Sequence, residues 1–92
     1  MAEELHYRQR DTLEKIFSHS SSGNIEWRRV VSLLEAIGTT GYEHNGKLRV
    51  TVGAETEVFK PPRGKDIDEQ MLVDLRRMLT NAGFAPGSDH GP

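Results

Sequence analysis

The sequence contains no cysteine, which excludes a disulfide framework and any chemistry that depends on a thiolate. It also has no apolar stretch long enough to span a bilayer, and its first residues are acidic, unlike the apolar run of a signal peptide. The four histidines are scattered, without the spacing that metal ligands show. These absences predict a cytoplasmic protein without a membrane partner, a metal site or a cofactor.

The composition is typical of one small domain. Only 35% of the 92 residues are hydrophobic, so we expect a compact core and polar ends. The net charge of −2 argues against strong non-specific binding to nucleic acid. We expect residues 1–23 to form an N-terminal helix and a Ser-rich linker, residues 24–84 to form the domain, and residues 85–92, rich in Pro and Gly, to form a disordered tail.

Apolar periodicity predicts three helices. The first covers about Glu4–Phe17. The second follows Asn24 as its N-cap, and we expect Gly38 to end it in the left-handed conformation. The third follows Asp68 as its N-cap and ends at Gly83-Phe84, with the phenylalanine folded back onto the last turn. The apolar stripe of this last helix consists of Met71, Leu72, Leu75, Met78 and Leu79.

Three short strands are predicted between the second and third helices. They cover Gly41–His44, Lys47–Val52 and Thr56–Lys60, and the turn signals Asn45-Gly46 and Gly53–Glu55 separate them. The alternation in the middle strand places its apolar residues on one face of the sheet and its basic residues on the other.

The order of these elements predicts an α+β fold. We expect a three-stranded antiparallel sheet with two helices packed on one face, preceded by a short N-terminal helix. This is the layout of a double-stranded-RNA-binding-type fold. The other face of the sheet should remain exposed to solvent. The helices and strands are expected to bury Trp27, Val31, Leu34, Leu75 and Leu79 against Leu48, Val50 and Val52.

A two-residue turn between the first two strands would set their register. It would place His44 opposite Lys47 and Tyr42 opposite Arg49, with all four side chains on the exposed face. The same register would turn Glu43 towards the core.

Positive charge gathers on the strands and on the loop that follows them. Basic residues held on a sheet and a constrained loop are suited to RNA phosphates. We therefore predict an RNA-binding site formed by Lys47, Arg49, Lys60, Arg63 and Lys65. Two alternatives stay open: these residues are ordinary solubilising charges, or they dock an acidic partner protein. Arg76 and Arg77, on the last helix, are interpreted as ordinary surface charges.

Several short motifs follow one another along the domain. They are Ile25-Glu26-Trp27-Arg28, Leu33–Gly38, Phe59–Arg63, Leu75–Leu79 and Ala82-Gly83. In this order and spacing the motifs resemble the HicA toxin family over about residues 24–84. The resemblance implies an RNA-binding fold, cleavage of messenger RNA as the family's activity, and a HicB-type antitoxin as partner.

The chain departs from this family at the start of the central strand. Many relatives have Gly-Ser-His there and some have Gly-Ser-Arg, whereas this chain has Gly46-Lys47-Leu48-Arg49. Aligned without a gap, Leu48 takes the place of the histidine, on the buried face. With one extra residue allowed, Arg49 takes it on the exposed face, and we favour Arg49 because a group that contacts substrate must be accessible. A general base works best with a pKa near the ambient pH, which histidine has and arginine lacks. We therefore expect Arg49 to clamp phosphate and cleavage to be weak or absent, with no catalytic residue assigned. The alternative is an active endoribonuclease. His44 is interpreted as a solvated residue at a strand end, and it is the one histidine that would serve as a base in that alternative.

Overall fold

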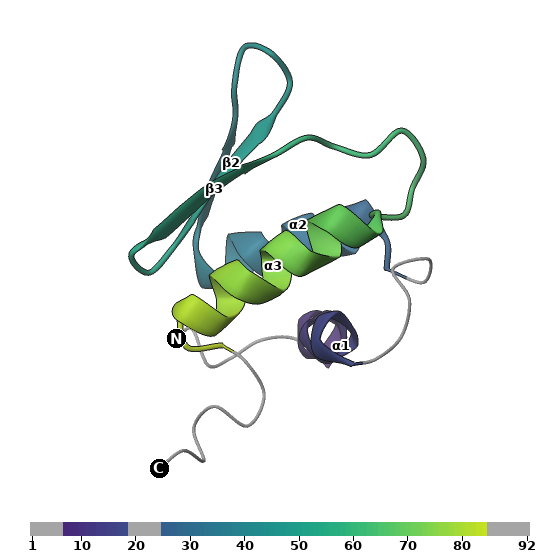
Figure 1. Ribbon diagram of the computed structural model, residues 1–92, viewed down its shortest axis with the longest axis vertical. Coiled ribbons are helices and arrows are strands. Elements are labelled where there is room, and N and C mark those ends of the chain that lie inside the picture. The colour runs from purple at the N-terminus through teal and green to yellow at the C-terminus, as the bar shows by residue number, and fades with distance from the viewer. Residues whose placement is uncertain (1–6, 19–24, 85–92) are drawn as a thin grey trace.

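The computed structural model describes residues 7–18 and 25–84, and within them it has the predicted α+β fold. The elements are α1 (Tyr7–Phe17), α2 (Trp27–Ile37), β1 (Thr39–Tyr42), β2 (Leu48–Val52), β3 (Glu55–Phe59) and α3 (Glu69–Asn81). The strands form one antiparallel sheet in the order β1-β2-β3 (Figure 1). The predicted tail and most of the predicted Ser-rich linker lie outside the described residues.

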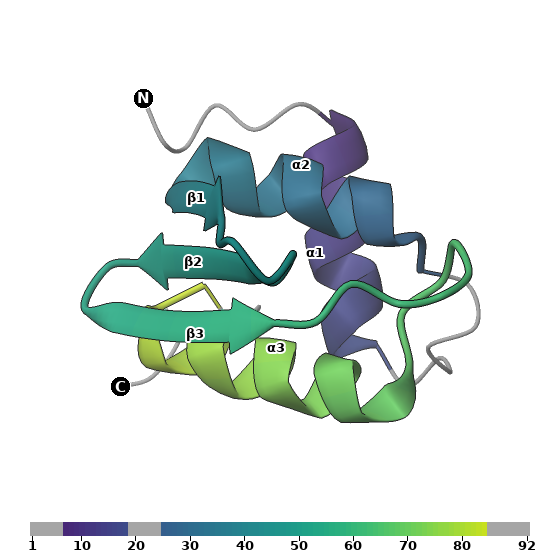
Figure 2. The ribbon, with the colours of Figure 1, turned by 90° about the horizontal axis from the view of Figure 1, so that it is seen from above.

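The described residues form three layers (Figures 1 and 2). Helices α2 and α3 both lie against one face of the sheet, with α2 next to β1 and α3 next to β3. Helix α1 crosses both of them on the side away from the sheet. The middle layer is therefore covered on two sides.

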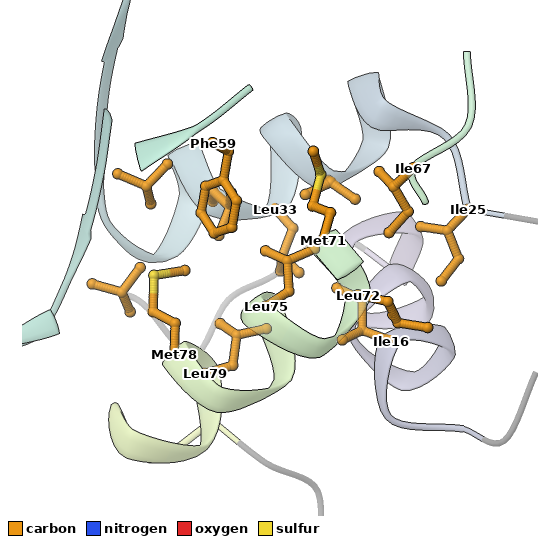
Figure 3. Close-up of a cluster of buried hydrophobic side chains, with 14 of the residues drawn as sticks. Ile16, Ile25, Leu33, Phe59, Ile67, Met71, Leu72, Leu75, Met78 and Leu79 are labelled. Carbon is orange, nitrogen blue, oxygen red and sulfur yellow. The ribbon is translucent and has the colours of Figure 1, made fainter. Parts of the chain in front are cut away.

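The core fills the space between these layers (Figure 3). The sheet contributes Leu48, Val50, Val52 and Phe59, and Ile16 of α1 closes the opposite side. All five residues of the stripe predicted on α3 are buried, so that prediction is confirmed. Because each large apolar side chain contributes about 1.5–3 kcal/mol when it is fully buried, this continuous core is the main source of stability.

The buried arc of α2 differs from the predicted one. Val30, Leu33 and Leu34 are buried, whereas Trp27 and Val31 are only partly buried at the margin of the core. The sequence pattern assumed that only the sheet covers this helix. Because α1 packs against a second side of α2, the buried arc is shifted towards Leu33.

Both ends of α2 also differ from the prediction. The helix begins at Trp27, with Glu26 in the N-cap position and Asn24 outside the described residues. At the other end, Gly38 has φ −157° and ψ −155°, so the predicted left-handed conformation is wrong. Glycine is required there for another reason: a Cβ at Gly38 would collide with the carbonyl oxygen of Thr51 in β2.

The predicted ends of α3 are confirmed. The Asp68 side chain accepts a hydrogen bond from the Met71 N–H at 2.8 Å, which satisfies one of the free donors in the first turn. After the helix, Gly83 has φ 90°, and the Phe84 N–H donates to the Leu79 carbonyl at 2.8 Å. This arrangement is a Schellman motif, which needs glycine at the left-handed position.

Helix α1 is attached to the other helices by polar contacts as well as by Ile16. The Arg76 guanidinium of α3 donates to the carbonyl oxygens of Ile16 and Ser18, both at 2.6 Å. These carbonyls lie at the end of α1, where the helix has no N–H groups left to pair with them. The interpretation of Arg76 as an ordinary surface charge was wrong, because only the packing of α1 brings these carbonyls to α3. Arg77 is exposed, and its ion pair is a local one, with Asp74.

The connection between β1 and β2 is longer than the predicted two-residue turn. Tyr42 pairs with Leu48 and Gly41 pairs with Arg49, so the register differs by one residue from the predicted one. Residues 43–47 form the loop, in which the Gly46 N–H donates to the Glu43 carbonyl at 2.9 Å. The predicted register would have buried the Glu43 carboxylate beside apolar side chains, which costs free energy unless a partner is present. The longer loop avoids that cost.

The close approach of β2 to Gly38 can be tested by comparing the stability of alanine variants at Gly38 and Gly41. We expect Gly38→Ala to lower the free energy of unfolding by about 1–3 kcal/mol or more, because the added methyl has no room beside β2. Gly41→Ala should leave stability unchanged or raise it by about 0.4–1 kcal/mol, because its Cβ would meet open space and alanine restricts the unfolded chain. Urea unfolding of both variants measures the difference, and equal stabilities would contradict the close approach at Gly38.

The Arg76 contact makes a second prediction. Removing it in Arg76→Ala should destabilise the protein by about 1.5–3 kcal/mol, because charge-assisted hydrogen bonds to two helix-end carbonyls are lost. The neighbouring Arg77→Ala, which breaks only an exposed ion pair, should change stability by less than about 0.5 kcal/mol. Amide hydrogen exchange should also accelerate in α1 of the Arg76 variant alone. Equal effects of the two variants would show that Arg76 does not hold α1.

Candidate nucleic-acid interface

The face of the sheet opposite the helices is open. Because Leu48, Val50 and Val52 of β2 point into the core, the alternate residues Arg49 and Thr51 point to the other side. Their cross-strand partners on β3 are Val58 and Thr56, and the Thr51 and Thr56 hydroxyl oxygens lie 3.1 Å apart. No helix or strand of the described residues lies over this face (Figure 1). It is a polar surface with one exposed apolar side chain, Val58.

Three of the predicted RNA-binding residues lie at one end of this face. Lys47 directly precedes Leu48 and Lys60 directly follows Phe59, and these two strand residues are paired. Both lysines are therefore at the same end of the sheet, and both are exposed, as is Arg49. We call Lys47, Arg49 and Lys60 the strand-end cluster.

One member of the strand-end cluster is already paired with an acid. The Nε and Nη2 atoms of Arg49 each lie 3.0 Å from Oε2 of Glu43. Their side chains are 60% and 28% exposed, so the pair is open to solvent and weakened by salt. The predicted register turned Glu43 into the core and therefore did not anticipate this contact. The ion pair lowers the positive charge of the cluster but leaves the guanidinium accessible to a competing anion.

The other two predicted residues lie elsewhere. Arg63 and Lys65 are exposed on the loop that leaves β3 and reaches the N-terminal end of α2 (Figure 2). The Lys65 carbonyl accepts a hydrogen bond from the Trp27 N–H at 2.7 Å, which attaches the loop to the start of the helix. Lys65 also lines a hollow of about 390 Å³ with Arg28 and three other residues. The five predicted residues thus form two groups, and a single RNA duplex would have to bridge them.

An open hollow of about 770 Å³ lies along β1 and the start of the next loop. Arg49 and Thr51 line it from β2, and His44 lines it from the loop. The prediction that His44 lies opposite Lys47 is wrong, because the register of the two strands differs by one residue. Tyr42 is 64% exposed and also lines this hollow, although its pairing with Leu48 places it on the helix side of the sheet. The predicted substitute base and the predicted phosphate clamp therefore border the same space.

A further basic group, which the sequence pattern did not predict, lies between α1 and α2. Arg8 of α1 and the neighbouring Arg28 and Arg29 of α2 border one hollow of about 320 Å³. These residues are about twenty positions apart in the chain. No spacing rule for one helix could have grouped them, since the crossing of α1 over α2 brings them together.

The comparisons with family models, with curated proteins and with solved structures find no match. The resemblance to the HicA family therefore remains a prediction from the sequence motifs. Within the described residues, no helix is long and apolar enough to cross a membrane. The same residues contain no cluster of three or more side chains of the kinds that commonly hold a metal ion.

The ion pair on the open face can be measured with a double-mutant cycle. Glu43→Ala and Arg49→Ala should show a coupling energy of about 0.2–1 kcal/mol at low salt, because both side chains are partly solvated. The coupling should fall as salt rises. A matched cycle of Glu43→Ala with Lys65→Ala should show none, since Lys65 lies on the loop after β3, next to the start of α2. Equal coupling in the two cycles would contradict a specific Glu43–Arg49 contact.

Proposed function

We propose that this chain is a HicA-like RNA-binding domain of a toxin–antitoxin type system, with weak or no cleavage of messenger RNA. The observation that carries the proposal is the strand-end cluster: Lys47, Arg49 and Lys60 at one end of a sheet face that the described elements leave uncovered. The motif resemblance supplies the family, RNA as ligand and a HicB-type antitoxin as partner. A cytoplasmic location belongs to the same proposal.

Phosphate contacts are the interaction that this surface supports best. Three basic side chains at one end of the sheet can each approach a phosphate of the RNA backbone. Such contacts depend on the shape and charge of the RNA more than on its nucleotide sequence. Arg49 would exchange the Glu43 carboxylate for a phosphate oxygen, so that one anionic hydrogen-bond acceptor replaces another. The modest number of basic residues agrees with a weak interaction that salt disrupts.

The same geometry argues for little cleavage. Arg49 can hold a phosphate and stabilise negative charge, but it cannot accept a proton at ordinary pH. The alternative of an active endoribonuclease is favoured by one observation, namely that His44 borders the same hollow as Arg49. A third function, docking of an acidic partner protein, is favoured by the carboxylate that Arg49 already binds.

The binding proposal predicts a strong effect of charge reversal. Lys47→Glu/Arg49→Glu should abolish binding to double-stranded RNA without unfolding the protein, because both side chains are exposed. Lys15→Glu/Arg77→Glu changes the net charge equally at exposed positions on two helices and should retain binding. Binding of a labelled duplex at several salt concentrations measures the affinity and its salt dependence. Equal losses in the two variants, or none in the first, would exclude the strand-end cluster as the RNA site.

The cleavage proposal is tested with purified protein and a defined RNA. The wild type should show little or no cleavage, and Arg49→His should gain activity because a suitable base then replaces arginine on the open face. The matched variant His44→Ala decides the alternative. Robust wild-type cleavage that disappears in His44→Ala would establish an active endoribonuclease with His44 as its base and would overturn the weak-cleavage proposal.

A further inference from the structure

The hollow between α1 and α2 has the features of an anion site. Arg8, Gln9 and Thr12 line it from α1, and Arg28, Arg29 and Ser32 line it from α2; we call it the arginine hollow. Its three arginines are exposed, so their guanidinium groups can reach a ligand from two helices. No acidic residue is among those that line it.

Hydrogen bonds between residues that line the arginine hollow join its two helices. The Gln9 Nε2 atom donates to the hydroxyl oxygen of Ser32 at 3.1 Å and to its carbonyl oxygen at 3.3 Å, which joins α1 to α2. Thr12 is buried, and its hydroxyl donates to the Arg8 carbonyl. Two helices that pack against each other and are joined by exposed hydrogen bonds thus present the arginines from neighbouring backbone positions.

Carboxylates lie beside the arginine hollow but do not line it. The Oε1 atom of Glu26 lies 3.1 Å from Nε of Arg28 and 3.9 Å from Nε of Arg29. Asp11 and Glu14 line an adjoining hollow that Arg8 and Arg29 also border. The side chains that line the arginine hollow itself are cationic or neutral, which suits an anion such as a phosphate monoester, whose charge is about −1.5 to −2. Arg28 and Arg29 also lie in the first turn of α2, where positive side chains oppose the helix dipole. A bound anion would relieve this repulsion.

An aromatic side chain lies beside the arginine hollow. Tyr7 is 76% exposed, and it lines an adjoining hollow of about 350 Å³ together with Arg8, Gln9 and Ser32. The two hollows share these last three residues, so one ligand can extend from the arginines to the tyrosine ring. Exposed aromatic rings next to basic side chains are suited to stacking on nucleobases.

We propose that the arginine hollow binds the phosphate of a nucleotide, with the base stacked on Tyr7. Arg8 and Arg29, from opposite helices, hold the phosphate oxygens, and Arg28 adds positive charge at the rim. The site is separate from the strand-end cluster, because α1 and the open face of the sheet are on opposite sides of the helix layer (Figure 1). Its ligand is either a free nucleotide or the phosphorylated end of an RNA strand, which present the same chemistry.

Adenosine monophosphate is the probe for this site. Added to the ¹⁵N-labelled full chain, it should produce saturable shifts of the Gln9 side-chain amide and of the Arg29 and Ser32 backbone amides. Inorganic phosphate should shift the same signals with lower affinity, and adenosine without phosphate should leave them unchanged. Absence of saturable shifts with adenosine monophosphate, or equal shifts with adenosine, would overturn the proposal.

Variants separate the arginine hollow from general charge. Arg8→Gln/Arg29→Gln should weaken binding of adenosine monophosphate by about tenfold or more, because charge-assisted hydrogen bonds are lost. Lys15→Gln/Arg77→Gln removes the same charge and should leave the affinity unchanged; an equal loss in this control would contradict the site. Arg8→Gln alone, at an exposed position, should weaken binding in the same direction, so the test stands even if the double variant is unfolded.

Two further arms identify the base contact and the source of the ligand. Tyr7→Ala should lower affinity for adenosine monophosphate by about tenfold and leave inorganic phosphate unaffected, and an unchanged nucleotide affinity would remove the stacking part of the proposal. An RNA strand with a 5′-phosphate should bind more tightly than its 5′-hydroxyl counterpart if the ligand is an RNA end, and Arg8→Gln/Arg29→Gln should remove the difference. Equal binding of the two strands, with adenosine monophosphate still bound, identifies a free nucleotide.

Discussion

The rest of the structure depends on burying α2 and α3 from two sides at once. A chain of this size has few apolar residues from which to form a core, and a sheet alone would leave the outer surfaces of both helices exposed. Helix α1 covers those surfaces with Ile16 and is held by the Arg76 guanidinium and by Gln9. The helix layer thereby becomes the centre of the core, and the sheet is stabilised through its contact with that layer.

This arrangement determines where binding surfaces can lie. Since the helices occupy one face of the sheet, the opposite face is the one on which Arg49 and its lysine neighbours gather. Since α1 must cross α2 to cover it, the crossing creates a hollow with arginines from both helices. The two candidate anion sites are thus consequences of the same packing, on opposite sides of one layer.

Charge on these surfaces is tuned by acids that pair with individual arginines. Glu43 occupies Arg49 on the open face, and Glu26 occupies Arg28 between the helices. Both pairs are accessible to solvent, so each contributes little stability and can be displaced by a stronger anion. The overall charge of −2 therefore coexists with local groups of basic side chains, each of which is partly paired with an acid.

Much of the fold could be predicted from local patterns. The periodic stripe of α3, its Asp68 cap and its Gly83 end were all correct, because each depends on residues within a few positions of one another. The strand alternation was also correct for β2, and it placed Arg49 on the open face. The β1–β2 register was wrong by one residue, since a strong turn signal was given more weight than the cost of burying Glu43.

The sequence by itself determined the α+β class, the core stripe of α3 and the alternation that leaves basic residues on one face of the sheet. Only the tertiary structure decided which charges meet: Glu43 with Arg49, Arg76 with the end of α1, and Arg8 with the arginines of α2. Periodicity is a property of neighbouring residues, so it shows which face a side chain occupies. It cannot show which distant side chain lies opposite, because that depends on how whole elements cross and pack.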